Sequence, residues 1–407
     1  MHLPDLRRRL APLAAGRFRV LFAATFASGI GTWLAVVALQ VDVYDRTHSG
    51  WWVGALLLAN IVPAVFLGVL LGPLVDALSR KGLMVASDLA RLAVFATLPF
   101  VHSAAAIVAL ALVAGIGNAF FRPAVLAGLP NLVGDDELPD ANALLYLVEW
   151  TTVALGPLAG GAITAASGPH LAYWVNAATF GLSALLVLRI PSRLLQSDRP
   201  IGRGHWRDLA EGFAVVRSSR ALLCVLVAWS VVMLANGAIN VAEVFLAKRS
   251  YSAGDFGFGL LWTGSGVGLV AGGLAASNLL ERGLQLTYVR MLLVFALGIA
   301  GAAAAPNVWV GTLAMVLSGF GNGGAIVANS TFVQRGAPDR VRGRAFTLLM
   351  SANYAVLAIS FVIAGPLTNA VGPRWVYAAA AVTIVVAAAT AWRIARVPAE
   401  RTVAHPA

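Results

Sequence analysis

The sequence has little charge and almost no cysteine. Only 12% of its 407 residues are charged, which is about half of what soluble proteins usually carry. Cys224 is the single cysteine, so neither an internal disulfide nor a thiolate metal cluster can form. The six histidines are scattered without the spacing of metal ligands. No metal and no other cofactor is therefore expected.

Hydrophobic residues, in contrast, make up 59% of the chain, and the mean hydropathy is +0.81. One helical crossing of a bilayer needs roughly 20 apolar residues, so a chain with about 240 of them has material for on the order of twelve crossings. This composition excludes a soluble enzyme, a DNA-binding protein and a disordered scaffold. It predicts an all-α polytopic membrane protein. Apolar runs of spanning length occur at about 20–41, 52–75, 83–101, 104–122, 143–166, 171–189, 221–243, 256–280, 286–304, 308–330, 345–368 and 375–394.

The net charge of +11 is interpreted as a sign of topology. In a soluble protein such an excess suggests a nucleic-acid partner, whereas membrane proteins concentrate Lys and Arg in their cytoplasmic loops. With the N-terminus in the cytoplasm, 25 of the 29 basic residues fall on that side, and Arg46, Lys248, Arg249 and Arg374 fall outside. Twelve spans then place both termini in the cytoplasm of a cell with a plasma or inner membrane, and no nucleic-acid partner is expected.

The longest polar interval lies at 191–220 and divides the spans into six and six. We therefore expect an N-terminal six-helix bundle at 1–190, a cytoplasmic linker at 191–220 and a C-terminal six-helix bundle at 221–407. Within the linker, apolar residues recur at helical spacing over 205–218, which predicts an amphipathic helix on the membrane surface. This helix is either a tether that lets two halves move or a passive surface element.

The two halves also repeat each other in sequence. A shift of 204 positions aligns GIGN at 115–118 with GFGN at 319–322, and Gly168-Pro169 with Gly372-Pro373, without a gap. The shift is half of the chain length, so the repeat is the whole half. Parallel repeats with a substrate site between them are a transporter architecture, because two similar halves can rock about a central site. The sequence therefore predicts two pseudo-symmetric bundles.

Two motifs resemble those of the major facilitator superfamily. The loop at 72–81 reads GPLVDALSRK and resembles the family's G-x-x-x-D-R-x-G-R-K motif, with Ala77 and Ser79 in place of its Arg and Gly. The fifth span carries GPLAGG at 156–161, which resembles the G-P-x-x-G-G motif of the superfamily's antiporters. The residues that match this antiporter motif are Gly156, Pro157, Gly160 and Gly161.

Further stretches are similar to the branch that contains enterobactin exporters and macrolide efflux proteins. They are ASDLAR at 86–91, FRP at 121–123, LPN at 129–131, ANA at 141–143, EGF at 211–213 and RGR at 342–344. The resemblance implies a bacterial multi-pass exporter that works as a monomer, takes a small drug-like or siderophore-like molecule, and uses the proton gradient as its energy source. Composition and spacing by themselves predict only a two-fold transporter.

Ionisable residues inside membrane spans are expensive and are functional candidates by default. Glu149 lies in the fifth span, two turns before the Gly156-Pro157 break, and is the first candidate for proton coupling. Asp42 and Glu243 lie near the outer ends of spans one and seven and could receive a proton or a cationic substrate. The alternatives are a structural ion pair for Glu149 and a solvated acid at the membrane interface for the other two, an alternative that is favoured for Asp42.

Polar and aromatic residues in the spans are candidates for contact with the substrate. Asn236, Asn240 and Glu243 share one face of span seven, because they recur at intervals of four and three. The repeat-related Asn118 and Asn322 are expected to face one another across the cavity or to pack their helices. The aromatic residues of spans one and seven, Trp33 and Trp229, are possible stacking surfaces. The alternatives are interhelical hydrogen bonds for the amides and packing or interface anchoring for the tryptophans.

Charged residues at the cytoplasmic ends of spans two and three are interpreted as an inner gate. In the superfamily, the aspartate of the 72–81 loop motif closes this gate through contacts with the other half, and basic residues before span eleven are available partners here. The alternative for the basic members is simple topology marking. The predicted gating residues are Asp76, Arg80, Lys81, Asp88, Arg91, Arg342 and Arg344.

The sequence therefore predicts a secondary active transporter that exports a small amphiphilic molecule by proton antiport, and not an enzyme. A proton-coupled importer, a lipid flippase and a non-transporting membrane sensor are the alternatives. The run GVGLVA at 266–271 fits the letters of a dinucleotide fingerprint, but it lies within span eight and no strand precedes it. Gly264, Gly268 and Gly272 are instead expected to form a stripe of small residues for close helix packing.

Overall fold

The computed structural model describes residues 10–70, 78–195, 213, 216–217, 219–281, 283–337 and 339–394. Within these ranges the chain is helical and contains no strand. The first half comprises α2 (Gly16–Thr47), α3 (Gly50–Leu70), α5 (Arg80–Thr97), α6 (Ala104–Gly128), α7 (Leu138–Ser167) and α8 (Pro169–Leu188). The second half comprises α10 (Arg220–Phe245), α11 (Gly254–Leu280), α12 (Leu284–Ala304), α13 (Val308–Gly336), α14 (Asp339–Val371) and α15 (Pro373–Ile394).

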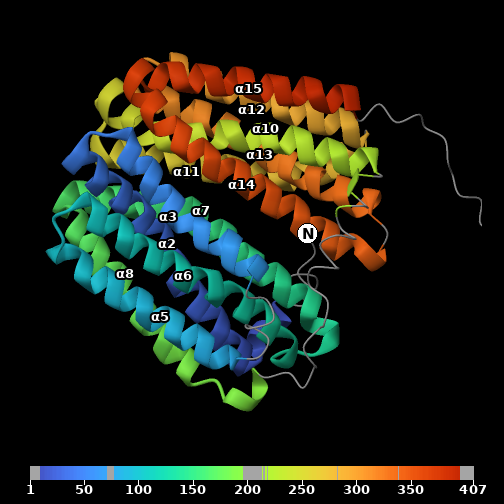
Figure 1. The fold of residues 1–407 in the computed structure, drawn as a ribbon. Helices are drawn as coiled ribbons and strands as arrows, with labels where there is room; N and C mark the ends of the chain where they lie inside the picture. Colours follow the sequence, from blue (N-terminus) through green and yellow to red (C-terminus); the bar gives the residue numbers. More distant parts are fainter. Residues whose placement is uncertain are drawn as a thin grey trace, which may run out of the picture.

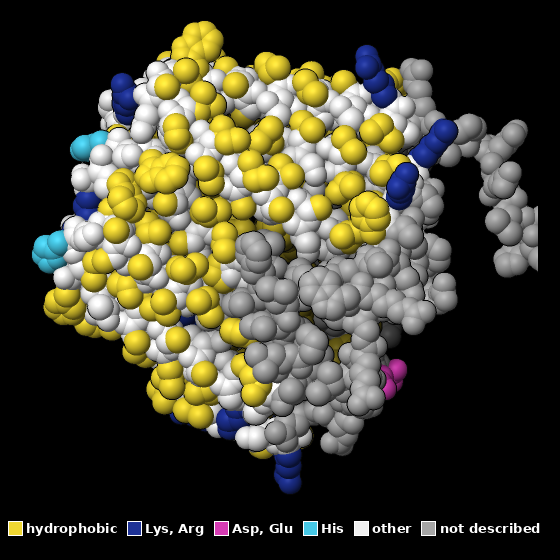
Figure 2. Space-filling view, viewed as in Figure 1, with side chains coloured by type: hydrophobic (Ala, Val, Ile, Leu, Met, Phe, Trp, Pro, Cys, Tyr) yellow, Lys and Arg dark blue, Asp and Glu magenta, His cyan; other side chains and the backbone are white. Residues whose placement is uncertain are grey.

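These helices confirm the predicted polytopic membrane fold. Eleven are long and apolar enough to cross a bilayer, and α3 contributes a shorter apolar helix, Gly50–Pro63, to the residues searched for spans. Hydrophobic side chains spread over the face of the molecule in Figure 2, while its Lys, Arg and His side chains lie at the margins. The expected amphipathic helix at 205–218 lies outside the described residues, apart from positions 213, 216 and 217.

The two halves pack in the same way. In the first half α2 packs on α7 and α8, α5 packs on α6 and α8, and α3 packs on α6. In the second half α10 packs on α14 and α15, α12 packs on α13 and α15, and α11 packs on α13. Each contact between two helices of the first half has its equivalent in the second half after the shift of 204 positions. The halves meet along α7 with α11 and α3 with α14, which are also equivalent contacts (Figure 1).

Repeat-related turns show why the same sequence pattern gives the same structure twice. Gly168 and Gly372 both have a positive φ, of 76° and 84°, and each is followed by the proline that begins the next helix. Glycine tolerates the left-handed region, and proline has the φ that the first position of a helix needs. The Gly-Pro pairs at 168–169 and 372–373 therefore turn the chain at equivalent places.

Contacts between the halves gather at one end of the molecule, which we call the closed end. Here the backbone N–H of Gly50 donates a hydrogen bond to Asn369 Oδ1 at 2.9 Å. The rings of Tyr44 and Phe245 meet edge to face, with 4.8 Å between their centroids. These residues lie where α2, α10 and α14 end and α3 begins.

The glycines of α11 confirm the expected packing stripe. A Cβ at Gly264 would lie 2.9 Å from the Thr312 carbonyl oxygen, and a Cβ at Gly268 or Gly272 would overlap the carbonyl oxygens of Val316 or Phe320. The backbone of α11 therefore touches the backbone of α13 along about two turns. Gly268 of the run at 266–271 serves this contact, whereas a Cβ at Gly266 would lie 2.9 Å from the Ala154 Cα on α7. The run therefore packs α11 against helices of both halves.

Candidate substrate and proton site

A cavity of about 200 Å³ lies inside the first half, and α2, α6 and α7 supply most of its polar lining, with Arg91 added from α5. The polar residues recur every three or four positions along each helix, so each helix presents one polar stripe to the cavity. The stripes are Thr25, Ser28 and Thr32 on α2, Asn118 and Arg122 on α6, and Asn142, Tyr146, Glu149 and Thr152 on α7. Such stripes inside otherwise apolar spans are a sequence signal that could have located the cavity.

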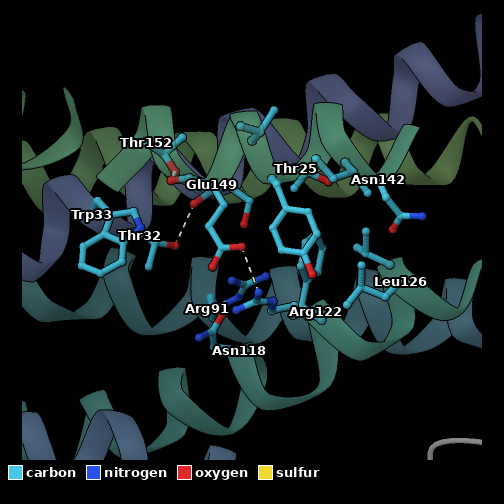
Figure 3. A pocket seen from close by; sticks show the side chains of 17 residues that line it. Thr25, Thr32, Trp33, Arg91, Asn118, Arg122, Leu126, Asn142, Glu149 and Thr152 are labelled. Atoms are coloured by element: carbon cyan, nitrogen blue, oxygen red, sulfur yellow. Dashed lines mark hydrogen bonds and ion pairs between the residues drawn. The ribbon is translucent and has the colours of Figure 1, made fainter. Parts of the chain in front are cut away.

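An ion pair between α6 and α7 lies in this cavity (Figure 3). Arg122 Nη2 donates to Glu149 Oε2 at 2.9 Å, and the two side chains are 59% and 39% exposed. The predicted proton-coupling residue thus has an immediate cationic partner, Arg122, which belongs to the FRP stretch at 121–123 and counts among the basic residues of the cytoplasmic side. An exposed pair of this kind is weak in water, so a charged group of another molecule can compete for either partner.

A second ion pair lies deeper in the first half. Arg91 Nη2 donates to Asp88 Oδ1 at 2.6 Å, and both side chains are almost fully buried. The Arg91 guanidinium carbon lies 4.7 Å and 4.3 Å from the ring centroids of Phe121 and Phe180. Such cation–π contacts, together with the carboxylate, compensate for the lost hydration of the guanidinium.

This placement corrects the predicted gate, because Asp88 and Arg91 do not lie at the end of the span. They lie two to three turns inside α5, and Arg91 reaches the lining of the cavity. The sequence does not show whether an arginine near a helix end is buried. A buried arginine that is paired with an acid and an exposed arginine that marks topology look the same in the sequence. Arg91 lines the cavity, and Asp88 is buried beside it.

The other predicted gating residues divide into two groups. Arg80 Nη1 donates to the Ala127 carbonyl oxygen at 2.8 Å, and Lys81 Nζ donates to the carbonyl oxygens of Leu188 and Ile190 at 2.7 Å. These cations hold the C-terminal ends of α6 and α8, where carbonyl groups lack helical partners. Asp76 lies outside the described residues, as do the side chains of Arg342 and Arg344. Their gating role stays a prediction.

Asp42 lies in a buried network. Only 4% of the residue is exposed, Arg46 Nε donates to its Oδ1 at 2.6 Å, and the Tyr173 hydroxyl donates to its Oδ2 at 2.9 Å. The favoured expectation of a solvated acid at the interface is therefore wrong. The reason is that Arg46, one turn further along α2, and Tyr173 of α8 cover the carboxylate.

The three residues of the predicted stripe on span seven are buried or half-buried. Glu243 is 3% exposed, and its Oε1 has no hydrogen-bond partner among the described residues. Asn236 and Asn240 are half-buried on the same helix. None of the three lines the cavity between α2, α6 and α7. Their contact with the substrate stays a prediction.

Of the remaining predicted substrate contacts, some line the cavity and others do not. Asn118 lines the cavity, whereas its repeat partner Asn322 is half-buried on α13 with an unpartnered Oδ1 within the described part of the chain. Trp33 lines the cavity and lies 5.8 Å from Trp262 of the other half, centroid to centroid. Trp229 is 6% exposed and belongs to the hydrophobic core. Of the two tryptophans, only Trp33 borders the cavity.

The predicted antiporter motif forms the contact between α2, α7 and α11. A Cβ at Gly160 would overlap the Leu34 carbonyl oxygen on α2, and one at Gly161 would lie 2.8 Å from the Asp255 carbonyl oxygen on α11. Gly156 packs against Trp33 in the same way. The glycines of this motif therefore let α7 touch one helix of its own half and one helix of the other half.

We expect Gly161→Val to prevent the closed end from closing fully, because the added atoms meet backbone and not a movable side chain. Spin labels on cysteines at Ser103 and Arg249, in a Cys224→Ser background, should report a larger population of long distances between the halves. Ala162→Val is the matched control, since Ala162 is the next residue and is exposed. Identical distance distributions for Gly161→Val and the parent protein would contradict this role.

A charged cluster also joins the halves at the closed end. Lys248 Nζ donates to Asp45 Oδ1 of the first half at 2.5 Å and to Asp255 Oδ1 of α11 at 2.6 Å. The π-helical turn Leu246–Ser250 places this lysine beyond the end of α10. The cluster is partly exposed, so its contribution is modest.

We expect Lys248→Met to shift the closed-to-open equilibrium about fivefold toward the open state, which corresponds to about 1 kcal/mol for a partly exposed ion pair. The same spin-label pair measures the shift. Asp45→Asn should give a similar change, and high salt should weaken the effect, because salt screens exposed charges. A salt-independent effect would indicate that packing, and not charge, joins the halves here.

Known proteins resemble this chain over most of its length. A family model described as transmembrane secretion effector matches residues 8–406. The chain belongs to this family of the major facilitator superfamily. It is 28% identical over 366 residues to the enterobactin exporter EntS of Shigella boydii, with 86% of this chain and 85% of the relative covered. It is 26% identical over 370 residues to the multidrug efflux pump Tap of Mycolicibacterium fortuitum, with 87% and 89% covered.

Solved structures of transporters share the fold. The nucleoside transporter NupG superposes with a TM-score of 0.73 at 16% identity, over 94% of this chain and all of that chain. The bacterial homologue of the lysosomal transporter Spinster superposes with a TM-score of 0.71 at 14% identity, over 93% and 97%. The family assignment and the helices together make this secretion effector a multi-pass protein of the bacterial inner membrane.

Proposed function

We propose that this protein exports a small amphiphilic molecule, drug-like or siderophore-like, in exchange for protons by alternating access. The observation that carries the proposal is the Arg122–Glu149 pair, which is exposed to a cavity inside an apolar bundle. Among the family's curated relatives are an enterobactin exporter and a multidrug efflux pump, which supports transport out of the cell.

The pair offers a physical route to coupling. When a proton binds Glu149, the carboxyl group loses its charge and Arg122 loses its ionic partner. When the proton leaves, the pair forms again, so proton occupancy and the charge presented to a substrate change together. One proton moving through 100 mV provides about 2.3 kcal/mol, which sustains nearly a fifty-fold gradient of a neutral substrate.

The rest of the cavity suits an amphiphile. Trp33, Tyr146 and Phe121 provide aromatic surface, while Asn118 and Asn142 provide amide donors and acceptors. A mostly apolar site with a few convergent polar groups is typical of small-molecule pockets. Access alternates if the halves rock about the α7–α11 and α3–α14 contacts that join them.

The test begins with a substrate panel in a host lacking its own exporters. The purified protein is then placed in proteoliposomes, and flux of the identified substrate is followed under pH gradients of both signs. Antiport predicts that the substrate moves in the direction opposite to the protons, and that its direction reverses when the pH gradient is reversed. Movement in the same direction as protons would identify an importer-type symporter, and flux that ignores the gradient would contradict proton coupling altogether.

A further inference from the structure

An apolar groove of about 870 Å³ runs along the outside of the second half, between α12 and α15. Its floor is built from alanines, whereas its rim carries large side chains that point outward. Leu297 is 63% exposed, Val382 is 64% exposed and Trp375 is 72% exposed. The floor alanines are Ala296, Ala300, Ala303, Ala304, Ala378 and Ala381. The groove is separate from the cavity of the first half and plays no part in the proposed transport mechanism.

The length of the groove matches one leaflet of a bilayer. It extends over residues 293–304 of α12 and 374–385 of α15, which run in opposite directions. Eleven steps along a helix span about 16 Å at 1.5 Å per residue, and half of a hydrocarbon core about 30 Å thick is about 15 Å. The groove therefore reaches from the membrane surface at the closed end to about the bilayer centre.

The mouth at the closed end is cationic. Arg374 is half-buried there, and its Nη1 donates to the Ala303 carbonyl oxygen at 2.8 Å. Its guanidinium carbon lies 5.4 Å from the ring centroid of Tyr251. These contacts orient the guanidinium, which has five N–H donors in total. Trp375, the next residue, occupies the position of an interfacial anchor.

We propose that this groove binds an anionic phospholipid of the leaflet at the closed end, with an acyl chain along the alanine floor and the phosphate at Arg374. Guanidinium and phosphate are complementary in charge and in geometry. The groove covers about half of the hydrocarbon core, which is the length of an acyl chain in one leaflet. A transmembrane helix of a partner protein spans the whole core of about 30 Å, so the groove would cover only about half of it, and a lipid chain fits the groove better.

The experiment measures lipid retention by native mass spectrometry. The full chain is purified in detergent, supplied with phosphatidylglycerol at fixed molar ratios, and compared with Arg374→Gln and with Ala378→Leu, which fills the floor. The matched controls are Arg249→Gln, an exposed arginine outside the groove, and Ala379→Leu, the exposed neighbour of Ala378. Thermal melting of each variant verifies that it is folded.

We expect one retained phosphatidylglycerol in the parent protein, about fivefold weaker retention in Arg374→Gln because one cationic contact to the phosphate is lost, and a similar loss in Ala378→Leu. Both controls should retain the lipid as the parent does. Equal retention in all five proteins would overturn the proposal. So would a shift to twice the chain mass, which would mean that a second copy covers the groove.

Discussion

Replacing Glu149 by glutamine is expected to abolish pH-driven transport while the protein stays folded. The amide keeps the shape of the side chain and a hydrogen-bond acceptor for Arg122 Nη2, but it cannot bind or release a proton at neutral pH. Accumulation against a gradient should fall at least about tenfold, because the 2.3 kcal/mol available from one proton at 100 mV no longer reaches the substrate. Exchange of labelled for unlabelled substrate, which needs no proton, should continue.

Three companion variants sharpen this test. Glu149→Asp retains a titratable group and should recover part of the pH-driven flux. Arg122→Gln removes the partner and should alter the pH dependence of flux without removing the proton site. Glu137→Gln, outside the cavity, should behave as the parent. If Glu149→Gln keeps full pH-driven flux, Glu149 has no part in coupling, and the buried carboxyl of Glu243 becomes the next residue to replace.

Replacing Arg91 by methionine is expected to cause the largest loss of stability. It removes one member of a buried ion pair and leaves the Asp88 carboxylate, whose Oδ2 already has no hydrogen-bond partner in the described part of the chain, without its cation. Breaking a buried pair from one side costs about 3–5 kcal/mol. The loss should appear as a lower midpoint of thermal unfolding in a fixed detergent.

The double variant Asp88→Leu/Arg91→Met distinguishes a charge effect from a packing effect. Replacement of both members of a buried pair by apolar groups is often neutral or stabilising, so most of the lost stability should return. A double variant as unstable as Arg91→Met would mean instead that the stacking of the guanidinium between Phe121 and Phe180 is the main contribution. Arg193→Met, at the exposed turn after α8, is the control for loss of an arginine.

The fold could be predicted from the sequence because its determinants are periodic. Apolar runs of about 20 residues specify spans, and the Gly-Pro pairs at 168–169 and 372–373 mark equivalent turns in the two halves. The glycines at 264, 268 and 272 specify a helix contact because nothing larger fits against α13. Each of these features depends on residues close together in one sequence segment.

The site could be predicted only in part, because its key contacts join separate helices. The sequence identified Glu149 as a carboxyl group inside a membrane span. Its ion pair with Arg122, 27 positions earlier, depends on how α6 faces α7. Asp42 illustrates the same limit, since Tyr173 covers it from a helix 131 positions away. The charge of a residue is evident from the sequence, whereas its burial is set by neighbours that the sequence does not place.

The interlocked backbones of α11 and α13 have an evolutionary consequence. Changes to these glycines disturb a backbone contact, whereas the cavity of the first half is lined by side chains of α2, α6 and α7 that can vary in size and polarity. Substitutions that change the exported compound should therefore be tolerated first among the side chains that line this cavity. The glycines of α11, and likewise Gly160 and Gly161 of α7, should tolerate almost none, because each lies against the backbone of another helix.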